Sequence, residues 1–325
     1  MNMKQVIFEQ TGLPKDVLQW VDAPMPEPKA HEVRIQVLAR NINPSDIMFI
    51  QGLYGIQPKL PCSAGFEAVG IIETTDSTSV FPVGTRVIFT AIGTWKEYVC
   101  VPVNSVIPIP ANMSNEMACQ AFVNPLTAYA MLEESGLKEG DKLLITAGAS
   151  AWGKLVIQMA KQKGIWVGAT VRQASQKKHL YDLGADLVID TENEKVTKLI
   201  KEQAPNGVQA VFDAVGGILA AQALSCLEIG GTMYVFGLLS LENIPLNSGL
   251  LIFKNLTVKG FWLSSWMENA SHETRKTAIK TVFEHLSKES IQVDIASTFP
   301  LEKFQEAICA YETPGRNGKV LIVSY

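Results

Sequence analysis

The sequence predicts an α/β protein in which a strand-rich domain precedes a doubly wound parallel sheet. From residue 141 onward, short apolar runs alternate with helical segments, which is typical of parallel strands joined by right-handed crossovers. Before about residue 120, short β-like runs are instead broken by Gly and Pro, as in domains with irregular loops. At roughly 150 residues per domain, the 325 residues suffice for two domains.

The first domain carries four strand-like segments, over residues 31–42, 68–75, 84–90 and 96–102. After Pro110 the pattern becomes helical. Residues 114–136 are expected to form a helix interrupted by a proline, and Ser114 is a good N-cap for it.

The second domain alternates regularly between strands and helices. We expect strands over 141–146, 165–171, 186–190, 208–215 and 231–237, and helices over 152–164, 179–185 and 196–205. Two more helices, over 274–291 and 301–312, precede a final strand over 318–325. The pattern alone does not decide which sheet this last strand joins.

Composition argues against several classes of protein. The 28 Lys and Arg against 32 Asp and Glu give a net charge of −4, so no basic excess is available to neutralise nucleic acid. The five cysteines are odd in number and lack C-x-x-C spacing, which favours free thiols in a reducing cytoplasm. We find neither a signal-peptide pattern nor an apolar run of about 18 residues, so a membrane partner is not expected.

The sharpest local motif is a glycine-rich turn between a strand and a helix. It reads Gly148-x-Ser150-x-x-Gly153 and follows the apolar run 143–146. Small residues let backbone N–H groups approach a pyrophosphate, and the helix N-terminus adds further donors and a favourable dipole. The motif predicts a dinucleotide-binding loop; the alternative is a tight turn that packs without a ligand.

The next strand is followed by residues that select the cofactor. An NAD site usually has an acidic residue about 20 residues into the unit, but here Arg172 and Gln173 follow the strand, with Lys177 and Lys178 close behind. Arg suits a phosphate because its donors pair with two oxygens. This segment, which contains no carboxylate, therefore predicts NADPH, unless Arg172 is an ordinary solvated side chain.

This order of parts resembles the medium-chain dehydrogenase/reductase superfamily. The resemblance implies a GroES-like catalytic domain over residues 1–120, completed by about 290–325, and a Rossmann NADPH-binding domain over 121–289. Zinc members carry Cys and Gly-His-Glu where this chain has Asn41 to Asp46 and Gly65-Phe66-Glu67. Since neither Asn-Pro nor Phe replaces such ligands, and the four histidines are scattered, no metal site is expected.

Within the zinc-free branch, the chain is most similar to the mitochondrial-type 2-enoyl thioester reductases. The similar segments are 43–61, 123–132, 250–266 and the phosphate loop; quinone oxidoreductase-like relatives share only part of this pattern. The resemblance implies that Tyr54 is the catalytic proton donor, although it is alternatively a loop tyrosine packed on Pro58 and Pro61. Two residues depart from the pattern: Phe66 replaces a polar residue, and Trp152 replaces a small aliphatic one. The bulky side chain of Trp152 is expected to shift the helix start or to narrow the cleft.

The resemblance also implies a set of cofactor-binding residues. Asn124 is expected beside the nicotinamide, where it would also serve catalysis, and Arg172 and Gln173 beside the adenosine ribose. The full set is Asn43, Asn124, Thr127, Gly148, Ala149, Ser150, Ala151, Trp152, Gly153, Arg172, Gln173, Lys177, Phe236, Gly237, Leu238, Phe261, Trp262, Leu263, Ser264 and Lys319.

These observations predict an NADPH-dependent oxidoreductase that reduces the C=C bond of 2-enoyl thioesters without a metal. An NADPH:quinone or enone reductase on the same scaffold is the alternative, and a non-catalytic NADPH-binding protein is a further one. We expect a cytoplasmic homodimer that pairs through an edge strand near 256–263, with an acyl carrier protein as a possible substrate carrier.

Overall fold

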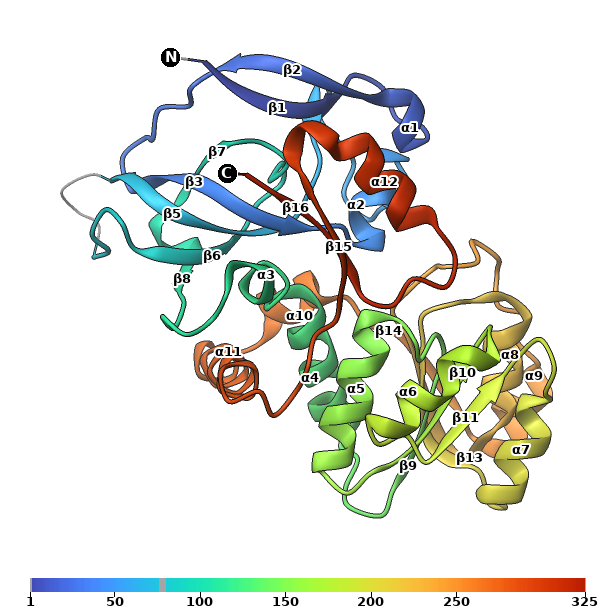
Figure 1. Ribbon diagram of the computed structural model, residues 1–325. Helices are drawn as coiled ribbons and strands as arrows, with labels where there is room; N and C mark the ends of the chain where they lie inside the picture. Colours follow the sequence, from blue (N-terminus) through green and yellow to red (C-terminus); the bar gives the residue numbers. More distant parts are fainter. Residues whose placement is uncertain (1, 76–79, 325) are drawn as a thin grey trace. The chain divides into compact units, whose positions relative to one another are not determined.

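The chain folds into two compact units, in agreement with the expected α/β class. The computed structural model describes residues 2–75 and 80–324. One unit comprises Met1–Val123 together with Asp294–Tyr325, and the other comprises Asn124–Val293 (Figure 1). These divisions lie a few residues after the boundaries expected from the sequence.

The first unit is built on two sheets. The larger follows the order β15-β16-β3-β5-β6-β8, with β7 also paired to β3, and the smaller follows β2-β1-β4. Their strands are β1 Asn2–Phe8, β2 Leu18–Pro24, β3 Glu32–Asn41, β4 Cys62–Ser63, β5 Glu67–Thr75, β6 Arg86–Thr90, β7 Tyr98–Pro102, β8 Val106–Pro108, β15 Ile295–Pro300 and β16 Lys319–Val323. The helical segments are α1 Pro14–Val17, α2 Pro44–Ile50, η1 Val103–Ser105, α3 Asn115–Ala118, η3 Leu301–Lys303 and α12 Phe304–Glu312.

The last strand returns to the first unit. β16 runs antiparallel to β3, with Leu321 opposite Asn41 and Ile322 opposite Arg40, and it runs parallel to β15. All five residues of β16 are buried, so its side chains complete the core of this unit. This pairing answers the question that the sequence pattern left open.

The second unit is a six-stranded parallel sheet with the order β11-β10-β9-β12-β13-β14. The strand order reverses between β9 and β12, which creates the switch point where doubly wound folds bind ligands. Figure 1 shows helices α5 to α9 packed around this sheet. Its strands are β9 Lys142–Ile145, β10 Trp166–Val171, β11 Leu187–Asp190, β12 Val208–Asp213, β13 Leu227–Val235 and β14 Thr257–Gly260; its helical segments are α5 Ala151–Gln162, η2 Ala174–Gln176, α6 Lys177–Asp182, α7 Val196–Gln203, α8 Gly217–Ser225, α9 Ser248–Lys254, α10 Leu263–Asn269 and α11 His272–Ser287.

The predicted interrupted helix over 114–136 is two separate helices. Ser114 caps α3, since its side chain accepts the N–H of Met117 at 3.1 Å. The second helix, α4, spans Val123–Ser135 and has Pro125 in its first turn. Proline is tolerated there because N–H groups of the first turn have no partner within the helix.

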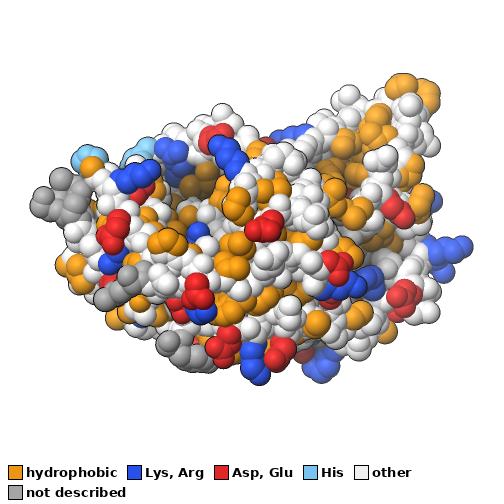
Figure 2. Space-filling model, turned by 90° about the horizontal axis from the view of Figure 1, so that it is seen from above, with side chains coloured by type: hydrophobic (Ala, Val, Ile, Leu, Met, Phe, Trp, Pro, Cys, Tyr) orange, Lys and Arg blue, Asp and Glu red, His pale blue; other side chains and the backbone are white. Residues whose placement is uncertain are grey.

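Surface charges are mixed in sign. On the face that Figure 2 shows, Lys and Arg side chains are interspersed with Asp and Glu rather than gathered together. Within residues 2–75 and 80–324, we find no helix with the length and apolar character needed to cross a membrane.

Candidate active site

The phosphate loop joins β9 to α5 in the second unit. Ser150 is the N-cap of α5, and its Oγ accepts the N–H of Gly153 at 3.0 Å. The N–H groups of Ala149, Ala151 and Trp152 donate no hydrogen bond to any described residue. A 12-residue helix therefore presents unpaired donors and the positive end of its dipole at this loop.

Both glycines of the motif are required by close packing. A Cβ on Gly148 would lie 2.7 Å from the Cβ of Ala169, and one on Gly153 would lie 2.6 Å from the carbonyl oxygen of Gly148. Such distances exclude any larger residue, so the backbone of the loop can lie close to strand β10 and to a ligand. This cradle and its donors fit a dinucleotide pyrophosphate.

Trp152 is the second residue of helix α5 and packs into the unit. Its indole is buried, with its ring centroid 4.0 Å from that of Phe236 and 6.2 Å from that of Phe212. Helix α5 begins one residue earlier, at Ala151. The bulky side chain therefore links the phosphate loop to the segment that follows β13.

A buried polar network, which the sequence analysis did not single out, joins the carboxyl ends of β9 and β12. Thr146 donates its hydroxyl proton to Asp213 Oδ1 at 2.7 Å and accepts the N–H of Ala214 at 2.9 Å. Asp213 Oδ2 accepts the N–H of Gly216 at 2.9 Å. The signal available in the sequence was a polar residue at the end of each of two neighbouring apolar strands.

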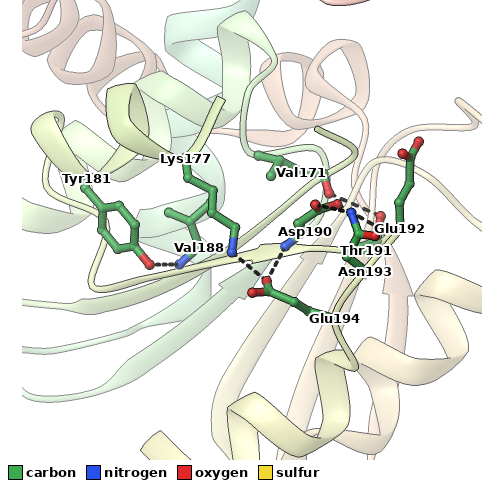
Figure 3. Close-up of polar contacts among 9 residues, drawn as sticks. All are labelled: Val171, Lys177, Tyr181, Val188, Asp190, Thr191, Glu192, Asn193 and Glu194. Carbon is green, nitrogen blue, oxygen red and sulfur yellow. Dashed lines mark hydrogen bonds and ion pairs between the residues drawn. The ribbon is translucent and has the colours of Figure 1, made fainter. Parts of the chain in front are cut away.

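The predicted cationic segment after β10 differs from expectation in one respect. Arg172 and Gln173 are exposed, but Lys177 is paired with Glu194, with 2.6 Å between Nζ and Oε2 (Figure 3). Lys178 is likewise paired with Asp182, at 2.7 Å. As the sequence shows, residues 172–176 contain no carboxylate. The loop after β11, however, places the carboxylate of Glu194 against Lys177.

In the first unit, Tyr54 lies in the loop after α2 and rests on Phe66. The two ring centroids are 5.2 Å apart, and Phe66 in turn lies 5.2 Å from Phe49 in an edge-to-face arrangement. Phe49 contacts Phe8 in the same way at 5.8 Å. Phe66, a departure from the family pattern, is thus the aromatic support that joins the half-buried Tyr54 to the core.

A second buried cluster surrounds the carboxylate of Glu67. Its Oε1 accepts the side-chain amides of Asn41 at 2.9 Å and Asn43 at 2.8 Å, and its Oε2 accepts the backbone N–H of Val123 at 2.9 Å. Lys319 Nζ donates to Asn43 Oδ1. One carboxylate thus fixes two asparagines and the first residue of α4.

Asp46 adds a further ionisable group to this cluster. Its Oδ2 accepts the N–H of Asn43 at 2.7 Å, within the capping box of α2. Burial raises the pKa of Asp46 to about 7, although the Asn43 hydrogen bond and the charge of Lys319 oppose this shift. Burial also lowers the pKa of Lys319 to about 8, opposed by the carboxylates of Glu67 and Asp46.

The residues at the family's zinc positions do not fit that metal. The pair Asn43-Pro44 stands in place of the cysteine and Phe66 in place of the histidine, and neither offers a ligand that zinc uses in proteins. Within residues 2–75 and 80–324, no three His, Cys, Asp or Glu side chains gather in a way that could hold a metal ion.

The predicted cofactor residues are divided between the two units. Asn43 and Lys319 belong to the first unit, as does the predicted proton donor Tyr54, and the remaining cofactor residues belong to the second. In the second unit, the segments 148–153, 172–173, 236–238 and 261–264 follow β9, β10, β13 and β14, so all of them lie at the carboxyl edge of one sheet. Thr127 and Phe261 are buried, whereas Trp262 is exposed.

Comparison with known proteins agrees with this architecture. The alcohol dehydrogenase GroES-like domain family matches residues 29–111, and the zinc-binding dehydrogenase family matches residues 151–284. The mitochondrial enoyl-[acyl-carrier-protein] reductase of Mus musculus is 33% identical over 330 residues, which cover 98% of this chain and 88% of that protein.

Two solved structures share the whole fold. Quinone oxidoreductase of Escherichia coli, complexed with NADPH, has a TM-score of 0.91 at 28% identity, over 98% of this chain and 99% of that one. The mitochondrial 2-enoyl thioester reductase Etr1p/Etr2p heterodimer of Candida tropicalis has a TM-score of 0.88 at 25% identity, over 99% and 100%. The chain therefore belongs to the medium-chain dehydrogenase/reductase superfamily of oxidoreductases, which confirms the resemblance inferred from its motifs.

Proposed function

We propose that this protein is an NADPH-dependent reductase of the C=C bond of 2-enoyl thioesters. The observation that carries the proposal is the 33% identity, over nearly the whole chain, to an enoyl-[acyl-carrier-protein] reductase. The similarity spans both units and therefore includes the segment with Tyr54 as well as the phosphate loop.

The second unit supplies a site for the cofactor. The unpaired N–H groups of the phosphate loop suit a pyrophosphate, and the exposed Arg172 suits a 2′-phosphate. The relative from Escherichia coli is described in complex with NADPH, which supports the same choice. When bound, NADPH supplies a hydride for the β-carbon of the substrate.

The first unit supplies the proton donor in this proposal. As the hydride reaches the β-carbon, the phenol of Tyr54 gives its proton to the α-carbon, so that the C=C bond becomes a C–C bond with two new C–H bonds. Solvent then returns a proton to the phenolate. Packing on Phe66 restricts the ring of Tyr54, which favours a fixed direction for the hydroxyl. Asn124 remains our prediction for the side chain beside the nicotinamide.

The second candidate is an NADPH:quinone or enone reductase. The observation that favours it is the TM-score of 0.91 to the Escherichia coli quinone oxidoreductase. Reduction of a quinone needs no proton on a specific carbon, so Tyr54 would be dispensable. Membership in a superfamily of oxidoreductases favours either activity over a non-catalytic binding role.

The test compares acceptors and a tyrosine variant. NADPH oxidation by the wild type and by Tyr54→Phe is measured with crotonyl-CoA, a longer enoyl-CoA and 1,4-benzoquinone. We expect enoyl-CoA turnover in the wild type and a loss of about 10²-fold in Tyr54→Phe, which is the usual size of a general-acid effect. Tyr98→Phe, on β7 of the same unit, is the matched control and should retain full turnover.

Turnover of benzoquinone alone, unchanged in Tyr54→Phe, would refute the thioester assignment and establish the second candidate. Tight NADPH binding without turnover of any acceptor would instead revive the non-catalytic alternative.

We further propose that the protein is a homodimer and that its thioester is carried by CoA or an acyl carrier protein. The support for a dimer is β14, which lies at one edge of the sheet in the second unit. We also propose a cytoplasmic location, because all five cysteines are free thiols, although the relative from Mus musculus is named as mitochondrial.

A further inference from the structure

The ammonium group of Lys177 is held by a carboxylate rather than left for a ligand. Its Nζ lies 2.6 Å from Glu194 Oε2, and the two side chains are 23% and 35% exposed (Figure 3). The same Oε2 accepts the backbone N–H of Asp190 at 2.8 Å. Both hydrogen bonds lower the pKa of Glu194, so this carboxylate is ionised at neutral pH.

The turn that carries Glu194 is fixed independently of Lys177. Asp190 is the last residue of β11, and its Oδ1 accepts the N–H of Glu192 at 3.1 Å while its Oδ2 accepts the side-chain amide of Asn193 at 2.7 Å. The N–H of Glu194 donates to the carbonyl of Asp190 at 2.8 Å. Because the backbone anchors the carboxylate, it would not follow Lys177 if the ammonium moved to another partner.

This turn lies beside Arg172 at the carboxyl edge of the sheet. Asp190 pairs with Val171 in the parallel register of β10 and β11. The N–H and the hydroxyl of Thr191 both donate to the carbonyl of Val171, at 2.9 and 3.1 Å. Arg172 is the next residue after Val171, so the chain at Arg172 leaves the sheet next to the turn that ends in Glu194.

The cationic side chains that follow β10 are not equally available to a ligand. Lys177 is neutralised by Glu194, and Lys178 by Asp182 at 2.7 Å. Arg172 is exposed and forms no ion pair with any residue in the described parts of the chain. A phosphate that took Lys177 would leave the anchored carboxylate of Glu194 facing a second anion, which is unfavourable.

We propose that Glu194 is a specificity-determining residue: it holds Lys177 and limits the affinity of the protein for a 2′-phosphate on the cofactor, which leaves Arg172 as the phosphate's cation. The inference rests on the proposed use of a nicotinamide dinucleotide. It assigns to Lys177 a role different from the phosphate contact that the sequence predicted.

The test measures equilibrium binding of NADPH and NADH to the full-length chain by quenching of tryptophan fluorescence. We expect Glu194→Gln to bind NADPH about 3- to 10-fold more tightly, because a repulsive charge is removed and Lys177 is released, and to bind NADH unchanged. Arg172→Met should weaken NADPH binding by about tenfold or more without affecting NADH. Lys177→Met should change NADPH binding less than Arg172→Met does.

Two further variants sharpen the test. In the double variant Lys177→Met/Glu194→Gln, the gain from the freed ammonium should disappear. Glu192→Gln is the matched control: it removes the same charge from the same turn, but this exposed side chain points away from Lys177 (Figure 3), so NADPH affinity should change by less than about twofold. Melting curves confirm that each variant is folded.

Three results would overturn the inference. Weaker NADPH binding by folded Glu194→Gln, or an equal shift for NADPH and NADH, would show that the pair only supports the fold. A loss in Lys177→Met as large as in Arg172→Met would show that the phosphate takes Lys177 from Glu194. Equal affinity of the wild type for NADPH and NADH, with Arg172→Met inert, would refute the proposed cofactor itself together with this inference.

Discussion

A site residue could be predicted from the sequence where all the residues that define its role lie in one short segment. Arg172 follows its strand directly, and the structure leaves its charge available, as the local sequence indicates. Lys177 was assigned from the same segment, but its partner Glu194 comes from the loop after the next strand, 17 residues away. The packing of Tyr54 on Phe66 could not be predicted either, because only the fold brings the two rings together. Contacts between segments that are distant in the sequence could therefore not be predicted from separate motifs.

At the residue scale, the buried carboxyl group of Asp46 predicts a pH-dependent stability. Its pKa is about 7 in the folded protein and about 3.9 in an unfolded chain, so between these values the folded state binds more protons. The stabilisation by protonated Asp46 is therefore complete below about pH 4 and is lost as the pH rises through 7. Asn at this position keeps an oxygen for the N–H of Asn43 but does not titrate.

Urea unfolding at pH 5 and pH 7 measures this effect. We expect the stability of the wild type relative to Asp46→Asn to fall by about 2 kcal/mol between the two pH values, since one proton contributes up to about 1.4 kcal/mol per pH unit. Asp16→Asn, an exposed carboxylate in α1, should show no such change. An unchanged difference between wild type and Asp46→Asn would contradict the raised pKa.

At the scale of elements, prediction succeeded where a pattern is local and failed where pairing is distant. The strand, turn and helix of the phosphate loop follow from apolar periodicity, small residues and the Ser150 cap within about 20 residues. The hairpin of β1 and β2 was not predicted, because helix α1 separates the two strands. The prediction that Pro125 interrupts a helix was wrong, because Pro125 lies in the first turn of α4.

The phosphate loop predicts the effect of one added methyl group. In Gly153→Ala the new Cβ would lie 2.6 and 2.8 Å from the carbonyl oxygens of Gly148 and Ala147, both backbone atoms that cannot move aside easily. We expect a loss of about 1–3 kcal/mol in unfolding free energy. Binding of NADPH should weaken by about tenfold or more, because the donors of the loop are displaced.

Gly249→Ala is the matched control for this change. Gly249 lies in the first turn of α9 in the same unit, and its added Cβ would meet only side-chain atoms, the nearest at 3.1 Å. Stability there should change by less than about 1 kcal/mol, with NADPH binding unaffected. Wild-type stability and binding in Gly153→Ala would show that the loop does not depend on this close packing.

At the scale of the whole molecule, the sequence pattern predicted the α/β class but not which sheet the last strand joins. Residues 294–325 rejoin the first unit because β16 pairs with β3, where Ile322 lies opposite Arg40, 282 residues earlier in the chain. By its composition, an apolar strand of this kind fits either sheet. Only its pairing with a strand that is distant in the sequence shows which sheet it joins. The family resemblance supplied this information, since it implied a C-terminal segment that completes the catalytic domain.

The proposed homodimer predicts the effect of a proline at the edge of the second unit's sheet. The N–H of Phe261 donates to Val235 on β13, so along β14 the alternate residues Lys259 and Thr257 also face β13, whereas Val258 and Gly260 direct their N–H groups outward. Val258→Pro removes one outward donor without removing a bond to β13.

We expect light scattering to give twice the 35.5 kDa chain mass for the wild type and the single-chain mass for folded Val258→Pro. Val258→Thr keeps both the N–H group and the branched shape, and should remain dimeric. A wild type with single-chain mass, or a Val258→Pro variant that is still a dimer, would show that β14 does not pair between copies of the chain.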